Sequence, residues 1–158
     1  MIQIISLDTL SIQINNLNLN IYKYHTLKII IEIITLFWII NLYNFMDGSD
    51  GLLSLNSIFI FSTLLFYTFI SPQVDYLLAI LICITIISLF SFLLFNLPNA
   101  KIFMGDSGSL FIGLFTYAIC VYMINQNLLD FWVFFILNSV FFIDSTFTFL
   151  KRLLKRKN

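Results

Sequence analysis

Two short polar segments interrupt an otherwise apolar chain, and they carry the residues best suited to chemistry. The first segment, residues 41–52, reads Asn-Leu-Tyr-Asn-Phe-Met-Asp-Gly-Ser-Asp-Gly-Leu, with Asp47 and Asp50 each followed by glycine. A spacing of three residues puts both carboxylates on one side of a helix end or tight turn. Asn41 and Asn44 continue this spacing upstream, which predicts a polar stripe facing a protein interior or an aqueous cavity. The alternative is an ordinary turn with Asx caps.

The second segment, residues 96–109, reads Asn-Leu-Pro-Asn-Ala-Lys-Ile-Phe-Met-Gly-Asp-Ser-Gly-Ser. It supplies a carboxylate at Asp106, a cation at Lys101 and an aromatic ring at Phe103. Mg²⁺ takes oxygen ligands, often one or two carboxylates plus substrate phosphates, and the first N–H groups of a helix favour anions. The segment therefore indicates a phosphate and magnesium site. Two alternatives stay open: Lys101 is only a membrane-surface anchor, and Asp106 or a following serine only caps the next helix.

The elements that position these segments are predicted to cross a membrane. The chain is 60% hydrophobic and only 10% charged, whereas soluble domains carry about a quarter charged residues. Its zero net charge excludes the basic footprint of a nucleic-acid-binding protein. Backbone groups in lipid must pair internally, so each apolar stretch of about 20 residues is predicted to be a helix. We expect an all-α polytopic bundle with five spans, at about 28–45, 53–70, 77–95, 109–125 and 128–148.

Lysine and arginine predict the orientation of these spans. Lys101 and five basic residues in the tail 151–158 fall on the side that also holds both polar segments. Because cytoplasmic loops carry an excess of Lys and Arg, this side is predicted to be cytoplasmic and the N-terminus periplasmic. We divide the chain into a periplasmic hairpin-like segment (1–27, with alternating residues at 11–15), a transmembrane bundle (28–150) and a basic cytoplasmic tail. The tail is an inside anchor or a surface for anionic lipid.

The motifs NLYNFMDGSDGL and NLPNAKIFMGDSGSLFIG resemble two signature loops of the glycosyltransferase family 4 membrane enzymes. These enzymes include phospho-MurNAc-pentapeptide and N-acetylhexosamine-1-phosphate transferases, and the first motif looks closest to the branch that starts O-antigen or lipopolysaccharide sugars. The resemblance implies an enzyme of the bacterial inner membrane with Mg²⁺ as cofactor. It would transfer a sugar-1-phosphate from a UDP-sugar to undecaprenyl phosphate and release UMP, an early step of cell-envelope polysaccharide synthesis.

The resemblance also implies roles for particular residues. Asp106 matches the magnesium-binding aspartate of the family, and Phe103 matches an aromatic residue that stacks on uracil. Asp47 and Asp50 match the acidic pair of the nucleotide pocket, with Asp50 near uracil, so these two and Asp106 are the candidate catalytic residues. Asn44 matches a polar position of the same pocket, and Lys101 is inferred to lie close to the phosphates.

The sequence also departs from the family pattern. It contains no Asp-Asp pair and ends before the histidine-containing loop of the full enzymes, and Asn99 stands where proline is common. We therefore expect a fragment, or one half of a two-chain enzyme or oligomer, without transferase activity alone. Detection of UMP release by the isolated chain would contradict this expectation. The alternative is a non-catalytic membrane subunit that binds a full-length homologue, in which case Mg²⁺-dependent UDP-sugar binding would be absent. Asp144, inside the last apolar stretch, either belongs to the pocket or bonds a neighbouring helix.

Overall fold

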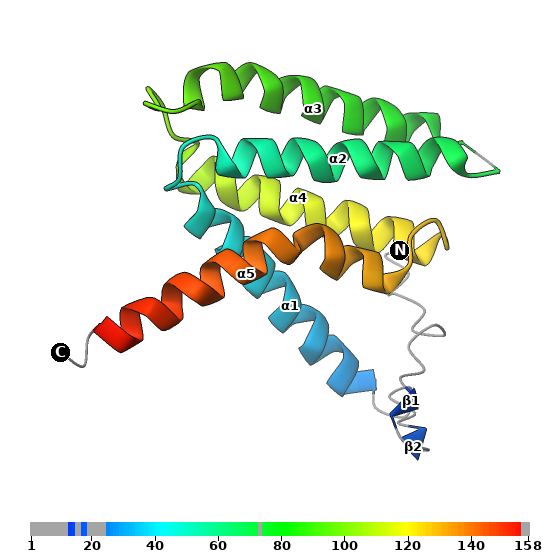
Figure 1. The fold of residues 1–158 in the computed structure, drawn as a ribbon. Coiled ribbons are helices and arrows are strands. Elements are labelled where there is room, and N and C mark those ends of the chain that lie inside the picture. Colours follow the sequence, from blue (N-terminus) through cyan, green and yellow to red (C-terminus); the bar gives the residue numbers. More distant parts are fainter. Residues whose placement is uncertain (1–12, 15–16, 19–24, 73, 156–158) are drawn as a thin grey trace.

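The computed structural model describes residues 13–14, 17–18, 25–72 and 74–155, which form five helices and one small pair of strands (Figure 1). Strands β1 (Gln13–Ile14) and β2 (Leu17–Asn18) pair antiparallel, with Gln13 opposite Asn18. The predicted alternating stretch at 11–15 lies partly outside the described residues. The helices are α1 (His25–Met46), α2 (Leu52–Ile70), α3 (Tyr76–Asn96), α4 (Gly105–Asn125) and α5 (Phe131–Lys155). The all-α prediction is confirmed for the described chain.

Four of the helices are long and apolar enough to cross a membrane. They are α2, α3 and α4 over their whole length, and α1 over Ile29–Met46. Within the described residues of helix α5, Phe131–Asp144 form a shorter apolar stretch. The prediction of five spans is thus confirmed for four helices, and the chain is a multi-pass membrane protein by the composition of its helices. The orientation of the termini stays a prediction.

Three helix starts differ from the sequence-based boundaries by three or more residues. Helix α1 begins at His25 rather than at 28. Helix α4 begins at Gly105 rather than at 109, because the side chain of Asp47 bonds the N–H group of Gly105. Helix α5 begins at Phe131 rather than at 128, because residues 126–130 form the turn between α4 and α5. Asn127 in this turn has a φ of 56°, a left-handed conformation that asparagine tolerates better than most residues.

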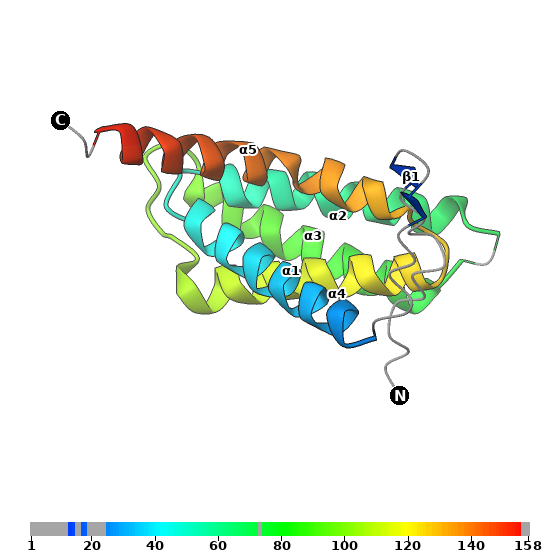
Figure 2. The same cartoon turned by 90° about the horizontal axis from the view of Figure 1, so that it is seen from below.

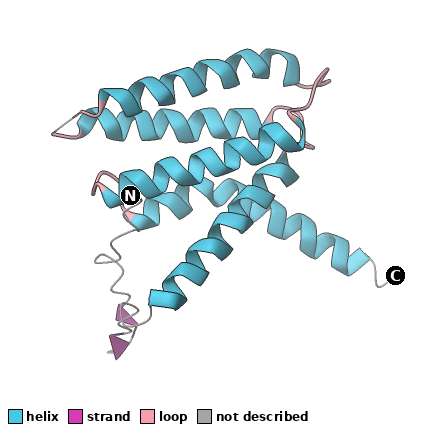
Figure 3. Ribbon diagram, turned by 180° about the vertical axis from the view of Figure 1, so that it is seen from behind, coloured by secondary structure: helices cyan, strands magenta, loops and turns pink. Residues whose placement is uncertain are grey.

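The helices pack as two main pairs. Helix α2 packs mainly on α3, and α1 packs mainly on α4 (Figure 3). At Gly113 of α4 an added Cβ would lie 3.1 Å from the Cα atom of Ile40 and from the Cβ atom of Tyr43. A small residue at a helix crossing lets two backbones approach closely, which is a common way to stabilise helix pairs in membranes. Gly113 therefore sets the spacing between α1 and α4.

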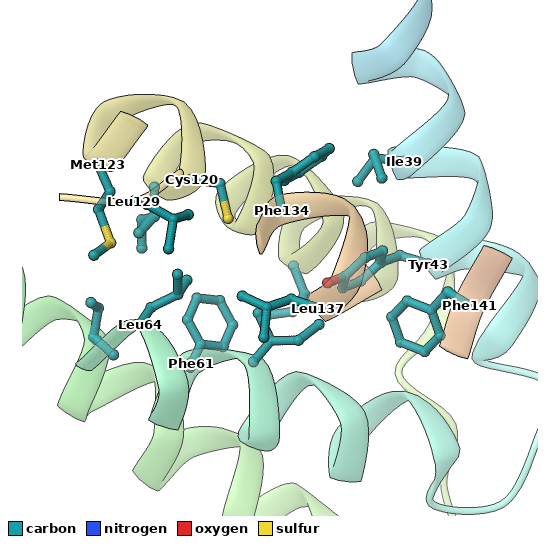
Figure 4. Packing of buried hydrophobic residues seen from close by; sticks show 14 of the residues in the cluster. Ile39, Tyr43, Phe61, Leu64, Cys120, Met123, Leu129, Phe134, Leu137 and Phe141 are labelled. Carbon is teal, nitrogen blue, oxygen red and sulfur yellow. The ribbon is translucent and has the colours of Figure 1, made fainter. Parts of the chain in front are cut away.

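A buried cluster joins the two pairs and includes α5 (Figure 4). Phe61 of α2, Cys120 of α4 and Phe141 of α5 are all fully buried in it. A polar contact lies within this apolar interior, because the hydroxyl group of Tyr43 donates a hydrogen bond to Oδ1 of Asn138 at 3.2 Å. Nδ2 of Asn138 in turn donates to a backbone carbonyl of α5 at 2.8 Å. The two partners satisfy each other and fix α5 against α1.

Candidate functional site

The two predicted loops lie side by side at one end of the bundle, between α1 and α2 and between α3 and α4 (Figure 2). They meet because the two helix pairs bring the end of α1 next to the start of α4, and the start of α2 next to the end of α3. Side chains of Asp47, Asp50 and Asn96 join the loops by hydrogen bonds. The sequence-based expectation that both polar segments share one end is confirmed.

Asp47 caps helix α4. Its Oδ1 atom accepts a hydrogen bond from the N–H group of Met104 at 3.1 Å, and its Oδ2 atom accepts one from the N–H group of Gly105 at 2.7 Å. The first N–H groups of a helix lack partners within the helix, and a carboxylate beside them is favourable. Asp47 is only 7% exposed, so these bonds are sheltered from water.

The early start of α4 follows from this cap. Gly105 adopts a φ of 72°, which glycine reaches without the steric cost that other residues meet. The alternative in which Asp106 or a following serine caps α4 is not what the structure shows, because the capping position is Met104 and the Met104 side chain makes no cap hydrogen bond. The cap comes instead from Asp47, 57 residues earlier in the chain.

Asp50 holds the tip of the second loop. Its Oδ2 atom accepts hydrogen bonds from the N–H groups of Asn99 at 3.1 Å and Ala100 at 3.3 Å. Hydrogen bonds to an ionised acceptor are stronger than neutral ones, although Asp50 is exposed to solvent here. Asn99 donates through an N–H group that proline lacks. The departure at Asn99 from the usual proline therefore adds a contact between the loops.

Asn96 is the residue that sequence reasoning missed. Its side chain is 1% exposed, and Oδ1 accepts hydrogen bonds from the N–H group of Gly51 at 3.0 Å and the hydroxyl group of Ser54 at 3.4 Å. Its Nδ2 atom donates to the carbonyl oxygen of Ile102 at 2.8 Å. One amide thus joins the start of α2, the end of α3 and the second loop. The signal in the sequence that could have identified Asn96 is its amide side chain directly after a long apolar run.

The predicted polar stripe on α1 divides into two parts. Asn44 faces α4, where its Oδ1 atom accepts a hydrogen bond from the hydroxyl group of Ser109 at 2.8 Å. The same hydroxyl group lies 2.9 Å from the carbonyl oxygen of Gly105, and Ser109 is fully buried. Asn41 is exposed and donates only to a carbonyl oxygen of its own helix. Asn44 therefore supports the first turn of α4, and Asn41 does not belong to the site.

The exposed side chains of the second polar segment include the three with predicted roles in substrate or metal binding. Lys101 and Asp106 face solvent, and Phe103 is 53% exposed. The backbone that carries them is fixed, since the N–H group of Lys101 donates to the carbonyl oxygen of Phe95 at 3.0 Å. Lys101 and Phe103 are thus displayed on a braced loop and Asp106 in the first turn of α4, while the side chains of Asn44, Asp47 and Asp50 are engaged in bracing contacts.

The described residues contain no group of three or more His, Cys, Asp or Glu side chains that could hold a metal ion. Asp106 nevertheless fits one role in magnesium binding, because Mg²⁺ often takes a single exposed carboxylate together with waters and substrate phosphates. Asp144 is exposed on α5, outside the two loops, and its role stays a prediction.

A cavity of about 510 Å³ lies at the opposite end of the bundle from the loops. It is lined by the turns before α3 and after α4, including Asp75 and Tyr122. Two hydrogen bonds fix its wall: Oδ2 of Asp75 accepts one from the hydroxyl group of Tyr122 at 2.7 Å, and Oδ1 accepts one from the N–H group of Leu78 at 3.0 Å. These donors lower the pKa of Asp75, the backbone bond being the larger cause. None of the candidate site residues lines this cavity.

Comparison with known proteins gives a consistent result. The sequence model described as "Glycosyl transferase family 4" matches residues 1–124. Similar proteins include the phospho-N-acetylmuramoyl-pentapeptide-transferases of Listeria monocytogenes serotype 4b (32% identity over 148 residues, 91% of this chain and 41% of the relative) and Streptococcus pneumoniae (33% over 132 residues, 81% and 38%). The enzyme of that name from Leuconostoc citreum is 43% identical over 81 residues, 49% of this chain and 24% of the relative.

Two consequences follow from these matches. The chain spans less than half the length of these curated relatives. The expected likeness to the O-antigen branch is not supported, because these relatives all carry the pentapeptide-transferase name. The first motif alone was too short to separate the two branches. No solved structure matches the chain.

Proposed function

This chain belongs to glycosyl transferase family 4, and from that premise we propose that it forms the UDP-sugar side of a sugar-1-phosphate transferase. The acceptor would be a polyprenyl phosphate and the released product UMP. The names of its relatives favour phospho-N-acetylmuramoyl-pentapeptide as the transferred group. The observation that carries the proposal is the display of Lys101 and Phe103 on a braced loop and of Asp106 in the first turn of α4. The bacterial cytoplasmic membrane is the proposed location, with this loop in the cytoplasm.

The loop suits the needs of phosphoryl transfer, which depends mainly on positioning and on neutralising charge. Phe103 would stack on the uracil ring, and Lys101 would lie near the diphosphate. Asp106 would supply a carboxylate ligand to Mg²⁺, which offsets negative charge on the diphosphate when it is bound. Each of these three side chains is exposed and therefore accessible to a nucleotide.

We propose that Asp47 and Asp50 act mainly as positioning residues. Between them they accept four backbone N–H groups of the second loop and the start of α4. Loss of either bond set would displace the loop that carries Phe103 or the helix start that carries Asp106. The pairing of Asn44 with Ser109 supports the same helix start, so Asn44 has the same proposed role.

The proposal is tested by nucleotide binding to the chain in nanodiscs. We expect UDP-N-acetylmuramoyl-pentapeptide and UDP to bind in a Mg²⁺-dependent manner, measured by isothermal titration calorimetry. Phe103→Ala should weaken binding by about 1–3 kcal/mol, the usual worth of stacking between a base and an aromatic side chain. Asp106→Asn should remove the Mg²⁺ dependence.

Matched controls are available for both variants. Phe90 on α3 is a similarly exposed phenylalanine, at 56%, and lies outside both loops. Asp130 is an exposed aspartate at the opposite end of the bundle. Phe90→Ala and Asp130→Asn should bind the nucleotide like the unaltered chain. Equal binding by all four variants would rule out the proposed site.

Catalysis is tested separately from binding. The lipid-phosphate side of the reaction has no assigned residue in this chain, so we propose that a complementary chain supplies it. The reconstituted chain should bind UDP-sugar without releasing UMP when polyprenyl phosphate is added. UMP release by the chain alone would disprove the need for a second chain. An absence of nucleotide binding would instead favour the non-catalytic subunit.

A further inference from the structure

One face of α5 carries a continuous stripe of exposed apolar side chains. Trp132, Ile136, Val140, Ile143 and Phe147 are between 46% and 70% exposed, and their spacing of three or four residues places them on a single helix face. Such a stripe on a helix of this composition is suited to contact with lipid. The stripe continues past Asp144 to Phe147.

The stripe ends at a cation. Lys151 is exposed and follows Phe147 by four residues, so it continues the same face. At 1.5 Å per residue, Trp132 and Lys151 are about 28 Å apart along the helix, which is close to the ~30 Å thickness of the hydrocarbon core. Tryptophan and lysine are both typical of the membrane–water interface. Lys151 therefore falls at headgroup depth if Trp132 lies at the opposite interface.

Helix α5 continues past this level to Lys155. Its C-terminal part projects beyond the two loops at that end of the bundle (Figures 1 and 2). Residues 151–157 read Lys-Arg-Leu-Leu-Lys-Arg-Lys, with five cations and no acidic residue. Asp144 is the nearest acidic residue along the chain and lies two turns earlier, on the apolar side of Lys151. The sequence thus concentrates positive charge directly after the apolar stripe.

We propose that the basic segment 151–157, which begins within the end of α5, binds the headgroups of anionic phospholipids. Each lysine or arginine close to an anionic membrane surface strengthens binding by about five-fold, and five of them occur within seven residues here. The contact would hold the projecting part of α5 at the membrane surface, at the same end as the two loops. The proposal stands whether or not the chain binds a UDP-sugar.

The test follows the environment of the tail in nanodiscs of defined composition. An environment-sensitive dye is attached to Asn158→Cys in a chain that also carries Cys83→Ser; Cys120 is fully buried and is left in place. Increasing the phosphatidylglycerol fraction in phosphatidylcholine should shift the emission to the blue, as the tail settles on the surface. The double variant Arg156→Gln/Lys157→Gln should need a several-fold larger phosphatidylglycerol fraction for half of the shift.

The swap Arg156→Lys/Lys157→Arg keeps the charge and should behave like the unaltered tail. Both positions lie outside the described bounds of α5, and neither makes a contact described above. Emission that does not respond to phosphatidylglycerol, or an equal response from the Gln variant, would overturn the proposal. Inorganic phosphate and chloride at equal ionic strength should reverse the shift equally. A stronger reversal by phosphate would show that the tail takes free phosphate rather than lipid headgroups.

Discussion

Replacing Asn96 with leucine should separate the two loops while preserving side-chain size. Leucine cannot accept from the N–H group of Gly51 or donate to the carbonyl oxygen of Ile102, so two backbone groups lose their partners. Each unsatisfied buried group costs about 1–3 kcal/mol, and the added apolar burial offsets about 1–2 kcal/mol of the total. The hydroxyl group of Ser54 can rotate to donate to a carbonyl oxygen of its own helix, so its lost bond to Asn96 adds little to the cost in stability. Two such groups at mid-range, less this offset, give an expected net loss of about 2–3 kcal/mol in the free energy of unfolding.

The assay is unfolding in mixed micelles, with hydrogen exchange of the amides at 97–104 as a local readout. These amides should exchange faster in Asn96→Leu, because the second loop is no longer tied to α2. Asn41→Leu is the matched control, since Asn41 is exposed and bonds only its own helix. It should change stability by less than about 0.5 kcal/mol. The reasoning is refuted if the two variants unfold alike and exchange at 97–104 is unchanged.

Three further predictions concern other contacts. Asp47→Ala removes the cap of α4 and should cost about 1–2 kcal/mol in the free energy of unfolding, measured in mixed micelles; an unchanged value would contradict the capping role. Gly113→Val should cost about 1–3 kcal/mol by the same measurement, since its side chain would push α1 and α4 apart. Gly48→Val, where the nearest atom to an added Cβ is 3.8 Å away, should cost much less, and equal losses would count against close packing. The lowered pKa of Asp75 means that its stabilisation is present above the unfolded pKa and is lost as pH falls through the folded pKa. Tyr122→Phe should flatten this acid-side loss of stability in an unfolding series against pH, and an unchanged slope would exclude the Tyr122 bond as a cause.

The helices were predictable because membrane spans depend on long apolar runs, which a single sequence displays directly. The bounds of the fifth helix were harder to predict, because it begins at Phe131 and continues to Lys155, past the start of the basic residues that follow the apolar run. The start of α4 could not be predicted, since it depends on the carboxylate of Asp47, in the loop after α1, accepting a hydrogen bond from Gly105. Long-range contacts of this kind leave no mark in local composition.

The sequence displayed the polar residue types of the two loops, but not which side chains bond the neighbouring loop and which remain exposed. Asp47 and Asp50 resemble substrate-binding acids in spacing, yet their carboxylates bond backbone N–H groups of the neighbouring loop. Asn96 was missed because it carries no charge, although it makes three hydrogen bonds between the loops and helices. Side chains that support a loop and side chains that contact a ligand are of the same polar types. Only the atoms that surround them in the folded structure tell the two roles apart.

The hydrogen bond between Tyr43 and Asn138 has a consequence for biosynthesis. A ribosome delivers α1 to the membrane well before α5, because Asn138 follows Tyr43 by 95 residues. Until then the hydroxyl group of Tyr43 cannot donate its hydrogen bond to Asn138, and a hydroxyl group without a partner in an apolar medium is costly in free energy. The main packing partner of α1, helix α4, also emerges only after the α2–α3 pair. The buried cluster is therefore complete only when α5 enters the membrane. A translation pause before α5 would leave α1 without the hydrogen bond between Tyr43 and Asn138.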